Sequence, residues 1–63
     1  MNLLASTVIA VPGDKVIIKL IETDDPGLLT VELKTSEFGK ETQVLPRDEA
    51  WTEYQSQVNM YFK

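Results

Sequence analysis

The chain has 63 residues, and its ten acidic and six basic side chains give a formal net charge of −4. Cysteine and histidine are both absent, which excludes disulfides, thiolate nucleophiles and the side chains that most often bind transition metals. We therefore expect one small domain over residues 1–63 that is not an enzyme and holds no cofactor or metal. The acidic balance argues against broad binding to nucleic acid, which requires clustered lysine and arginine.

No stretch of the sequence is apolar for long enough to cross a membrane. The longest uninterrupted apolar run is Val8 to Val11, whereas a membrane-spanning helix needs about 20 residues. The N-terminal segment MNLLASTVIAV lacks the basic residues that begin a signal peptide, so we interpret it as a strand. A chain without disulfides fits a reducing compartment, and we expect the protein in the cytoplasm or in a virus particle.

Three turn signals divide the first two-thirds of the sequence into short segments. Pro12-Gly13 and Pro26-Gly27 place proline and glycine as a type II turn requires them, and Gly39 stands where a type I turn is followed by a residue with positive φ. The segments between these turns predict four strands, at about residues 3–11, 15–22, 28–35 and 40–45. The expected fold is mainly β: a four-stranded antiparallel meander or small barrel, followed by a C-terminal helix.

The C-terminal third changes to a helical period. Pro46 suits the entry of a helix. Large apolar side chains then recur three and four positions apart: Trp51, Tyr54, Val58 and Tyr61. This pattern predicts a helix at about residues 47–60. We expect Trp51 and Tyr54 to pack over the sheet, because this one helix must supply much of the core of so small a domain. The alternative is that these two side chains anchor a partner, a role in which tryptophan and tyrosine are enriched.

The predicted second strand is apolar on both of its faces, unlike the third. One face would carry Val16, Ile18 and Leu20, and the other would carry Lys15, Ile17, Lys19 and Ile21. A helix can cover only one of these faces, so Ile17 and Ile21 would be left for another chain to cover. We therefore expect Ile17 and Ile21 in a protein–protein interface, with Tyr61 and Phe62 of the helix end nearby.

These patterns indicate a small non-catalytic protein-interaction or structural module. Apolar surface beyond the needs of one small monomer points to a homo-oligomer, or to an accessory subunit of a larger assembly such as a virus particle. The expected partner is a protein, either a second copy of the chain or another component of the assembly.

Glu22, Asp24 and Asp25 cluster beside the second turn. Carboxylate oxygens are ligands that calcium prefers, but the spacing lacks the alternating acidic residues and the distal glutamate of an EF-hand loop. We interpret the cluster as a solvated turn in which Asp24 or Asp25 accepts hydrogen bonds from the backbone.

The segment VLPRDEAWTEY indicates an alternative function. It resembles the end of the carbon storage regulator family, in which a strand runs into an arginine, two acidic residues and a helix that bears a tyrosine. Members of that family are small intertwined β dimers that bind mRNA leaders. The resemblance implies an RNA-binding regulator in which Arg47 contacts RNA. Lys15 and Lys19, which share one face of the predicted second strand, would be further RNA contacts in this alternative. The first strand of the family carries basic residues, whereas this chain has LLASTV there.

Overall fold

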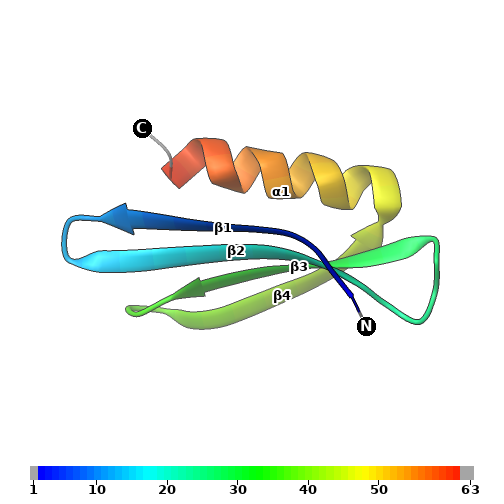
Figure 1. The fold of residues 1–63 in the computed structure, drawn as a ribbon, viewed down its shortest axis with the longest axis horizontal. Coiled ribbons are helices and arrows are strands. Elements are labelled where there is room, and N and C mark those ends of the chain that lie inside the picture. Colours follow the sequence, from blue (N-terminus) through cyan, green and yellow to red (C-terminus); the bar gives the residue numbers. More distant parts are fainter. Residues whose placement is uncertain (1, 62–63) are drawn as a thin grey trace.

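The computed structural model describes residues 2–61 as one antiparallel sheet with a single helix packed on it (Figure 1). The elements follow each other in the order β1 (Leu3–Val11), β2 (Asp14–Glu22), β3 (Leu28–Thr35), β4 (Gly39–Pro46) and α1 (Arg47–Tyr61). Each strand pairs with its neighbour in the chain, so β1 and β4 are the two edges of the sheet. The expected meander with a C-terminal helix is confirmed, and the sheet is open rather than closed into a barrel.

Two hairpin turns form as their glycines predict. Gly13 and Gly39 have φ angles of 80° and 81°, and within residues 2–61 these two residues alone have positive φ. Glycine reaches this region without the steric penalty that a Cβ brings. Gly13 therefore completes the turn after Pro12, and Gly39 closes the loop between β3 and β4.

The turn between β2 and β3 differs from the expected type II geometry. Gly27 does not have the positive φ that this geometry demands. Instead, Asp25 accepts the N–H of Gly27 through its carboxylate (2.8 Å) and the N–H of Leu28 through its backbone carbonyl (3.0 Å). Aspartate in the first position and proline in the second are typical of a type I turn, and the aspartate side chain fixes the turn here.

The core lies between α1 and one face of the sheet. The helix packs mainly against the two central strands, β2 and β3. Buried and accessible positions alternate along these strands, so every second side chain points toward the helix. The buried apolar residues are Ile9, Val16, Ile18, Leu20, Leu29, Val31, Ala50 and Tyr54.

Tyr54 is the aromatic residue that joins the helix to the sheet. It is only 7% exposed, and its hydroxyl lies 2.6 Å from Oγ1 of Thr7 on β1. Trp51 is 42% exposed and packs edge-to-face with Tyr54, with ring centroids 6.2 Å apart. The expectation that both rings pack on the sheet holds for Tyr54 and is wrong for Trp51. Ala50 is buried against the sheet, and one further residue turns the helix by about 100°, which leaves Trp51 on its flank.

A β-bulge near the start of β1 changes the face that Leu3 occupies. Leu3 pairs with Ile21 and Ala5 pairs with Leu20, so the register shifts between Leu3 and Ala5. Strict alternation would place Leu3 and Ala5 on the same face, but the extra residue of a bulge breaks the alternation. Leu3 therefore lies beside Ile21, on the face away from the helix.

Asp14 ties the start of β2 to the turn between β3 and β4. Its Oδ1 accepts the backbone N–H of Lys15 (2.6 Å), the backbone N–H of Ser36 (3.1 Å) and the hydroxyl of Ser36. The hydrogen bond from the Ser36 side chain, followed by the two from backbone N–H groups, lowers the pKa of Asp14 below its ordinary value of 3.8. The ionised carboxylate thus holds two neighbouring turns together.

Substitution of Tyr54 and Trp51 should separate their roles. We expect Tyr54→Ala to lower the free energy of unfolding by about 3–5 kcal/mol, because a buried aromatic ring is lost. Tyr54→Phe, which removes only the hydroxyl bonded to Thr7, should cost about 1 kcal/mol. Trp51→Ala should cost less than half as much as Tyr54→Ala, since much of the Trp51 ring already faces water. Urea unfolding at low protein concentration measures these differences, and equal losses for the two alanine variants would contradict the assignment.

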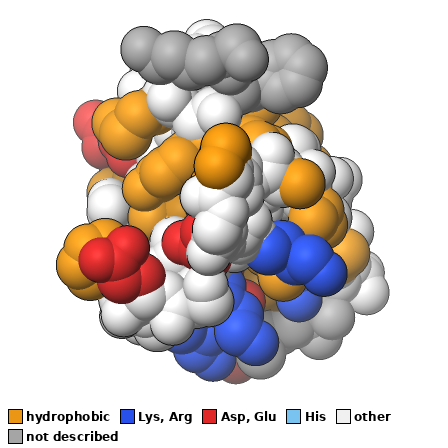
Figure 2. Space-filling view, turned by 90° about the vertical axis from the view of Figure 1, so that its left-hand side faces the viewer, with side chains coloured by type: hydrophobic (Ala, Val, Ile, Leu, Met, Phe, Trp, Pro, Cys, Tyr) orange, Lys and Arg blue, Asp and Glu red, His pale blue; other side chains and the backbone are white. Residues whose placement is uncertain are grey.

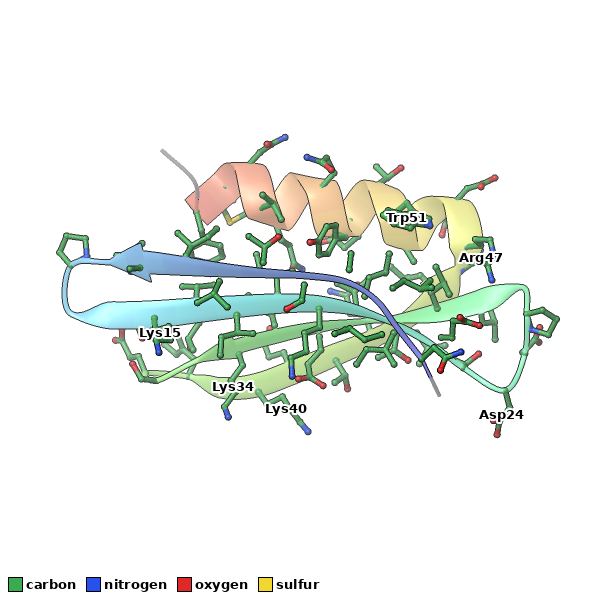
Figure 3. The ribbon with its side chains drawn as sticks, viewed as in Figure 1. Lys15, Asp24, Lys34, Lys40, Arg47 and Trp51 are labelled. Atoms are coloured by element: carbon green, nitrogen blue, oxygen red, sulfur yellow. The ribbon has the colours of Figure 1, made fainter. Side chains whose placement is uncertain are left out.

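Asp14→Ala should destabilise the protein at neutral pH and lose this effect in acid. The pKa of Asp14 is lower in the folded chain than in the unfolded chain, so its stabilisation is present above pH 3.8 and disappears as the pH falls through the lower folded value. We expect the melting temperature of Asp14→Ala to lie below that of the wild type at neutral pH and to converge with it in stronger acid. Asp24→Ala removes the same charge from an exposed turn (Figure 3) and should change little. If the melting temperature of Asp14→Ala stays equally far below that of the wild type in acid, the ionised carboxylate of Asp14 is not the cause of the difference.

Candidate protein-interaction face

The open face is the side of the sheet away from α1. Residues directly opposite each other in an antiparallel pair project to the same side, so the strand register identifies the residues of this face. They are Leu3, Ser6, Val8 and Ala10 on β1, Lys15, Ile17, Lys19 and Ile21 on β2, Leu28, Thr30, Glu32 and Lys34 on β3, and Lys40, Thr42, Val44 and Pro46 on β4. No helix within residues 2–61 covers them.

Aliphatic side chains form a band, interrupted by the Ser6–Lys19 pair, on the half of the open face that β1 and β2 provide. Val8 lies opposite Ile17, and Leu3 lies opposite Ile21. Val8 and Leu3 are 58% and 55% exposed, whereas the two isoleucines are half-buried between their neighbours. Val44 adds another exposed aliphatic side chain on β4. Exposed apolar side chains gathered on one surface are typical of a contact site for another molecule.

Lysines gather on the open face at the end of the sheet where the β1–β2 and β3–β4 turns lie. Lys34 stands directly opposite Lys40, and such a like-charge pair destabilises a sheet. Figure 3 shows Lys15, Lys34 and Lys40 projecting away from the helix at this end. In the view onto this end, the basic side chains lie on the lower part of the molecule, opposite the helix (Figure 2). Lys19, farther along β2, lies directly opposite Glu32 of β3.

The side of the molecule that carries α1 is acidic. Asp48 and Glu49 in the first turn of the helix, and Glu53 in the next turn, line an open groove of about 400 Å³ between the helix and β4. Carboxylates in the first turn interact favourably with the helix dipole, which accounts for Asp48 and Glu49 without a ligand. The chain therefore separates its charges, with the lysines on the open face and these carboxylates on the helix side.

The predicted interface residues do not lie on one surface. Ile17 and Ile21 are on the open face, as the alternation of β2 implies. Tyr61 packs against the core on the helix side and lines a small hollow beside the β3–β4 turn. The expectation that Tyr61 lies near the two isoleucines is therefore wrong, because the sheet separates them. Phe62 lies outside the described residues.

The residues of the alternative RNA site are also separated. Arg47 begins α1, and its Nε donates a hydrogen bond to the carbonyl of Pro26 (3.0 Å). Figure 3 shows Arg47 and Lys15 at opposite ends of the molecule. Lys15 and Lys19 both lie on the open face, whereas Arg47 links the helix start to the β2–β3 turn.

In the acidic turn between β2 and β3, the carboxylate of Asp25 is hydrogen-bonded to the backbone of the turn. Asp25 bonds the N–H of Gly27, as expected for a solvated turn. Within residues 2–61, the acidic side chains form no group of three or more that could hold a metal ion. The same part of the chain contains no helix with the length and apolar character needed to span a membrane.

Val8, Val44 and Lys40 belong to the open face, but sequence reasoning did not single them out. A signal for Lys40 was available, because the loop that ends at Gly39 sets the register of its hairpin. Gly39 pairs with Thr35, so the next pair outward from the turn is Lys34 with Lys40. No comparable signal joined Val44 to the aliphatic residues of β1 and β2, since two strand registers must be known to place it.

Comparison with models of known protein families, with curated protein sequences and with solved structures gives no match for this chain.

Lys40→Glu should stabilise the folded chain. The substitution turns the Lys34–Lys40 pair into a pair of opposite charges, and such cross-strand pairs contribute about 0.2–1 kcal/mol. We expect the free energy of unfolding to rise by an amount in this range at low ionic strength and by less at high ionic strength. Lys40→Gln, which only removes the repulsion, should give a smaller gain. A lower stability of Lys40→Glu in urea unfolding would mean that the two lysines do not repel each other.

Proposed function

We propose that the protein is a small non-catalytic interaction module whose open face binds an acidic surface of a partner protein. The observation that supports this proposal is the combination of uncovered aliphatic side chains and lysines on one side of the sheet. Such a module would act as an oligomeric or accessory subunit of a larger assembly.

The extent of the open face supports a protein as the partner. A stable interface of ordinary size covers about 800 Å² on each protein. That is close to a fifth of the 4346 Å² that this structure exposes. Four strands of eight or nine residues, about 4.8 Å apart and rising about 3.3 Å per residue, give one sheet face a projected area of about 500 Å² before the relief of the side chains is counted. Complete burial of a valine, leucine or isoleucine contributes about 1.5–3 kcal/mol relative to exposure. Covering Val8, Leu3 and Val44 would therefore supply a substantial part of a binding free energy.

The lysines favour an acidic partner. Lys15, Lys19, Lys34 and Lys40 share the open face with the single carboxylate of Glu32. An acidic surface would neutralise them and remove the repulsion between Lys34 and Lys40. Proteins keep locally destabilising groups where a function requires them, and the cost of this like-charge pair is consistent with such a role.

The composition of the open face supports protein over RNA as the ligand. Sheets that bind single-stranded nucleic acid stack the bases on aromatic side chains. None of the residues that the register assigns to the open face is aromatic. Arg47, the residue that the RNA alternative requires most, lies at the far end of the molecule from Lys15.

A synthetic amphipathic helix with one leucine face and one glutamate face is a suitable probe. We expect the wild type to bind this peptide, with the affinity measured by isothermal titration calorimetry. The double variant Val8→Thr/Val44→Thr keeps the shape of both side chains but makes them polar. It should bind about tenfold more weakly, equivalent to about 1.4 kcal/mol. Met60→Gln changes another exposed apolar side chain, on α1, and should bind as the wild type does.

The same titration tests the charge argument. A peptide with lysine in place of glutamate should bind markedly more weakly than the acidic peptide, and both affinities should be compared at low and high salt. Equal affinity for the two peptides would refute the acidic partner, and unchanged binding by the valine variant would refute the open face as the site. Sequence-selective binding of an RNA hairpin that is lost in Arg47→Ala would favour the RNA-binding regulator instead.

A further inference from the structure

We propose that β1 pairs antiparallel with β1 of a second copy, so that two chains form a symmetric dimer with one continuous sheet. This contact uses the edge of the sheet, and it stands independently of the acidic partner proposed for the open face. It is supported by the difference between the two edge strands and by the position of Trp51.

The two edges of the sheet differ in charge. An edge strand directs alternate N–H and C=O groups outward, where they can pair with another strand. Charged side chains on an edge oppose such pairing, and β4 carries Lys40 and Glu41 among its exposed residues. The sequence of β1, LLASTVIAV, has no charged residue over its whole length. In the described structure β1 is therefore an edge strand without electrostatic protection.

A second copy of the chain fits this edge. The bulge between Leu3 and Ala5 disturbs the start of β1 and leaves Ser6–Val11 in regular register with β2. Two copies of this segment related by a twofold axis present matching lengths of unpaired backbone, with no like charges opposed. The β-branched residues in this segment, Thr7, Val8, Ile9 and Val11, also suit strand pairing.

Trp51 lies where a second copy would contact it. Trp51 and Glu53 are two residues apart, which places them about 200° apart around the helix, on opposite flanks. Glu53 lines the groove on the β4 side, so Trp51 occupies the flank toward β1. Its neighbour Tyr54 is hydrogen-bonded to Thr7 of β1, in agreement with this placement. A half-exposed tryptophan beside a free strand edge is well placed as an anchor for a partner, a role in which tryptophan is enriched.

Pairing through β1 would also join the two open faces. The aliphatic band lies on β1 and β2, next to the new contact, whereas Lys34 and Lys40 lie on the distant strands β3 and β4. In the dimer, the two aliphatic bands would meet at the centre of one wide surface. The lysines would stand toward its two outer ends.

A pair of lysine substitutions tests the choice of edge. Ser6 on β1 and Thr42 on β4 belong to the same row of the sheet, since Lys19 faces Ser6 and Glu32 lies between Lys19 and Thr42. Both residues are exposed, so each can accept a lysine without disturbing the core. We expect the wild type to form dimers in analytical ultracentrifugation, Ser6→Lys to dissociate at least about tenfold more readily, and Thr42→Lys to behave as the wild type. Circular dichroism verifies that both variants are folded.

Single cysteines identify the pairing directly, because the chain has no cysteine of its own. Among Ser6→Cys, Val8→Cys and Ala10→Cys, the position nearest the twofold axis should form a disulfide dimer rapidly on mild oxidation, and Thr42→Cys should not. Trp51 is the one tryptophan in the chain, so its fluorescence emission should shift to longer wavelength on dilution as the dimer separates. If Ser6→Lys does not fold, the cross-linking and fluorescence measurements still test the pairing through β1, because they use the wild type and variants that differ little from it.

Three results would overturn the proposal. The first is a wild type that stays monomeric at about millimolar concentration, the range in which weak contacts form. The second is a dimer that survives Ser6→Lys but is lost in Thr42→Lys, which would assign the contact to β4. The third is equal cross-linking at Thr42 and at the β1 positions. None of these outcomes affects the binding of the acidic peptide, which tests the open face separately.

Discussion

A single helix can cover only one face of a four-stranded sheet, and the rest of this structure depends on that constraint. The helix α1 has 15 residues and packs on β2 and β3. It buries Val16, Ile18 and Leu20 almost completely, whereas Ile17 and Ile21 on the same strand remain half-buried on the other side. If one face of β2 were meant to contact water, the strand would carry polar residues on that face. The sequence of β2 is therefore suited to a sheet with two covered faces, and the described chain covers one of them.

The covered face is itself not optimised for stability. Gln57 is buried at the helix–sheet contact, where its Nε2 donates to Glu53 (2.9 Å) and its Oε1 has no hydrogen-bond partner among residues 2–61. A buried acceptor without a partner costs about 1–3 kcal/mol, a large amount for a domain of this size. Asp14, outside the core, compensates in part by tying two turns together. Small domains are marginally stable and gain stability from any partner that binds only their folded form, which is consistent with a role in an assembly.

The sequence predicted the order of the elements well because local rules decide it. Gly13 and Gly39 mark positions where only glycine is free of strain, and the change from a two-residue to a helical period after β4 is unambiguous. The turn at Pro26-Gly27 was predicted less well, because the carboxylate of Asp25 selects a different turn type from the one that proline and glycine suggest.

The open face was harder to predict than the fold, because it depends on contacts between distant strands. The alternation of β2 correctly separated Ile17 and Ile21 from the core. Alternation alone could not place Leu3, whose face depends on the bulge, or Lys40, whose partner depends on the register of the last hairpin. Trp51 shows the same limit on the helix: its spacing from Tyr54 fits an apolar face, but the rotation of the helix on the sheet leaves it on the flank.

The two proposed contacts would reinforce each other through geometry. A dimer joined along β1 presents two open faces in one plane, with the aliphatic residues near its centre and Lys34 and Lys40 toward each end. A partner with two acidic segments could occupy both halves, and the second segment would then bind at the high effective concentration that the first creates. Modest affinity at each open face would suffice for a stable complex, because avidity and not the area of one small sheet would set its strength. In these proposals the uncharged edge of β1 and the lysines on the far strands would have complementary roles: the edge would bring the two copies together, and the lysines would select what they bind.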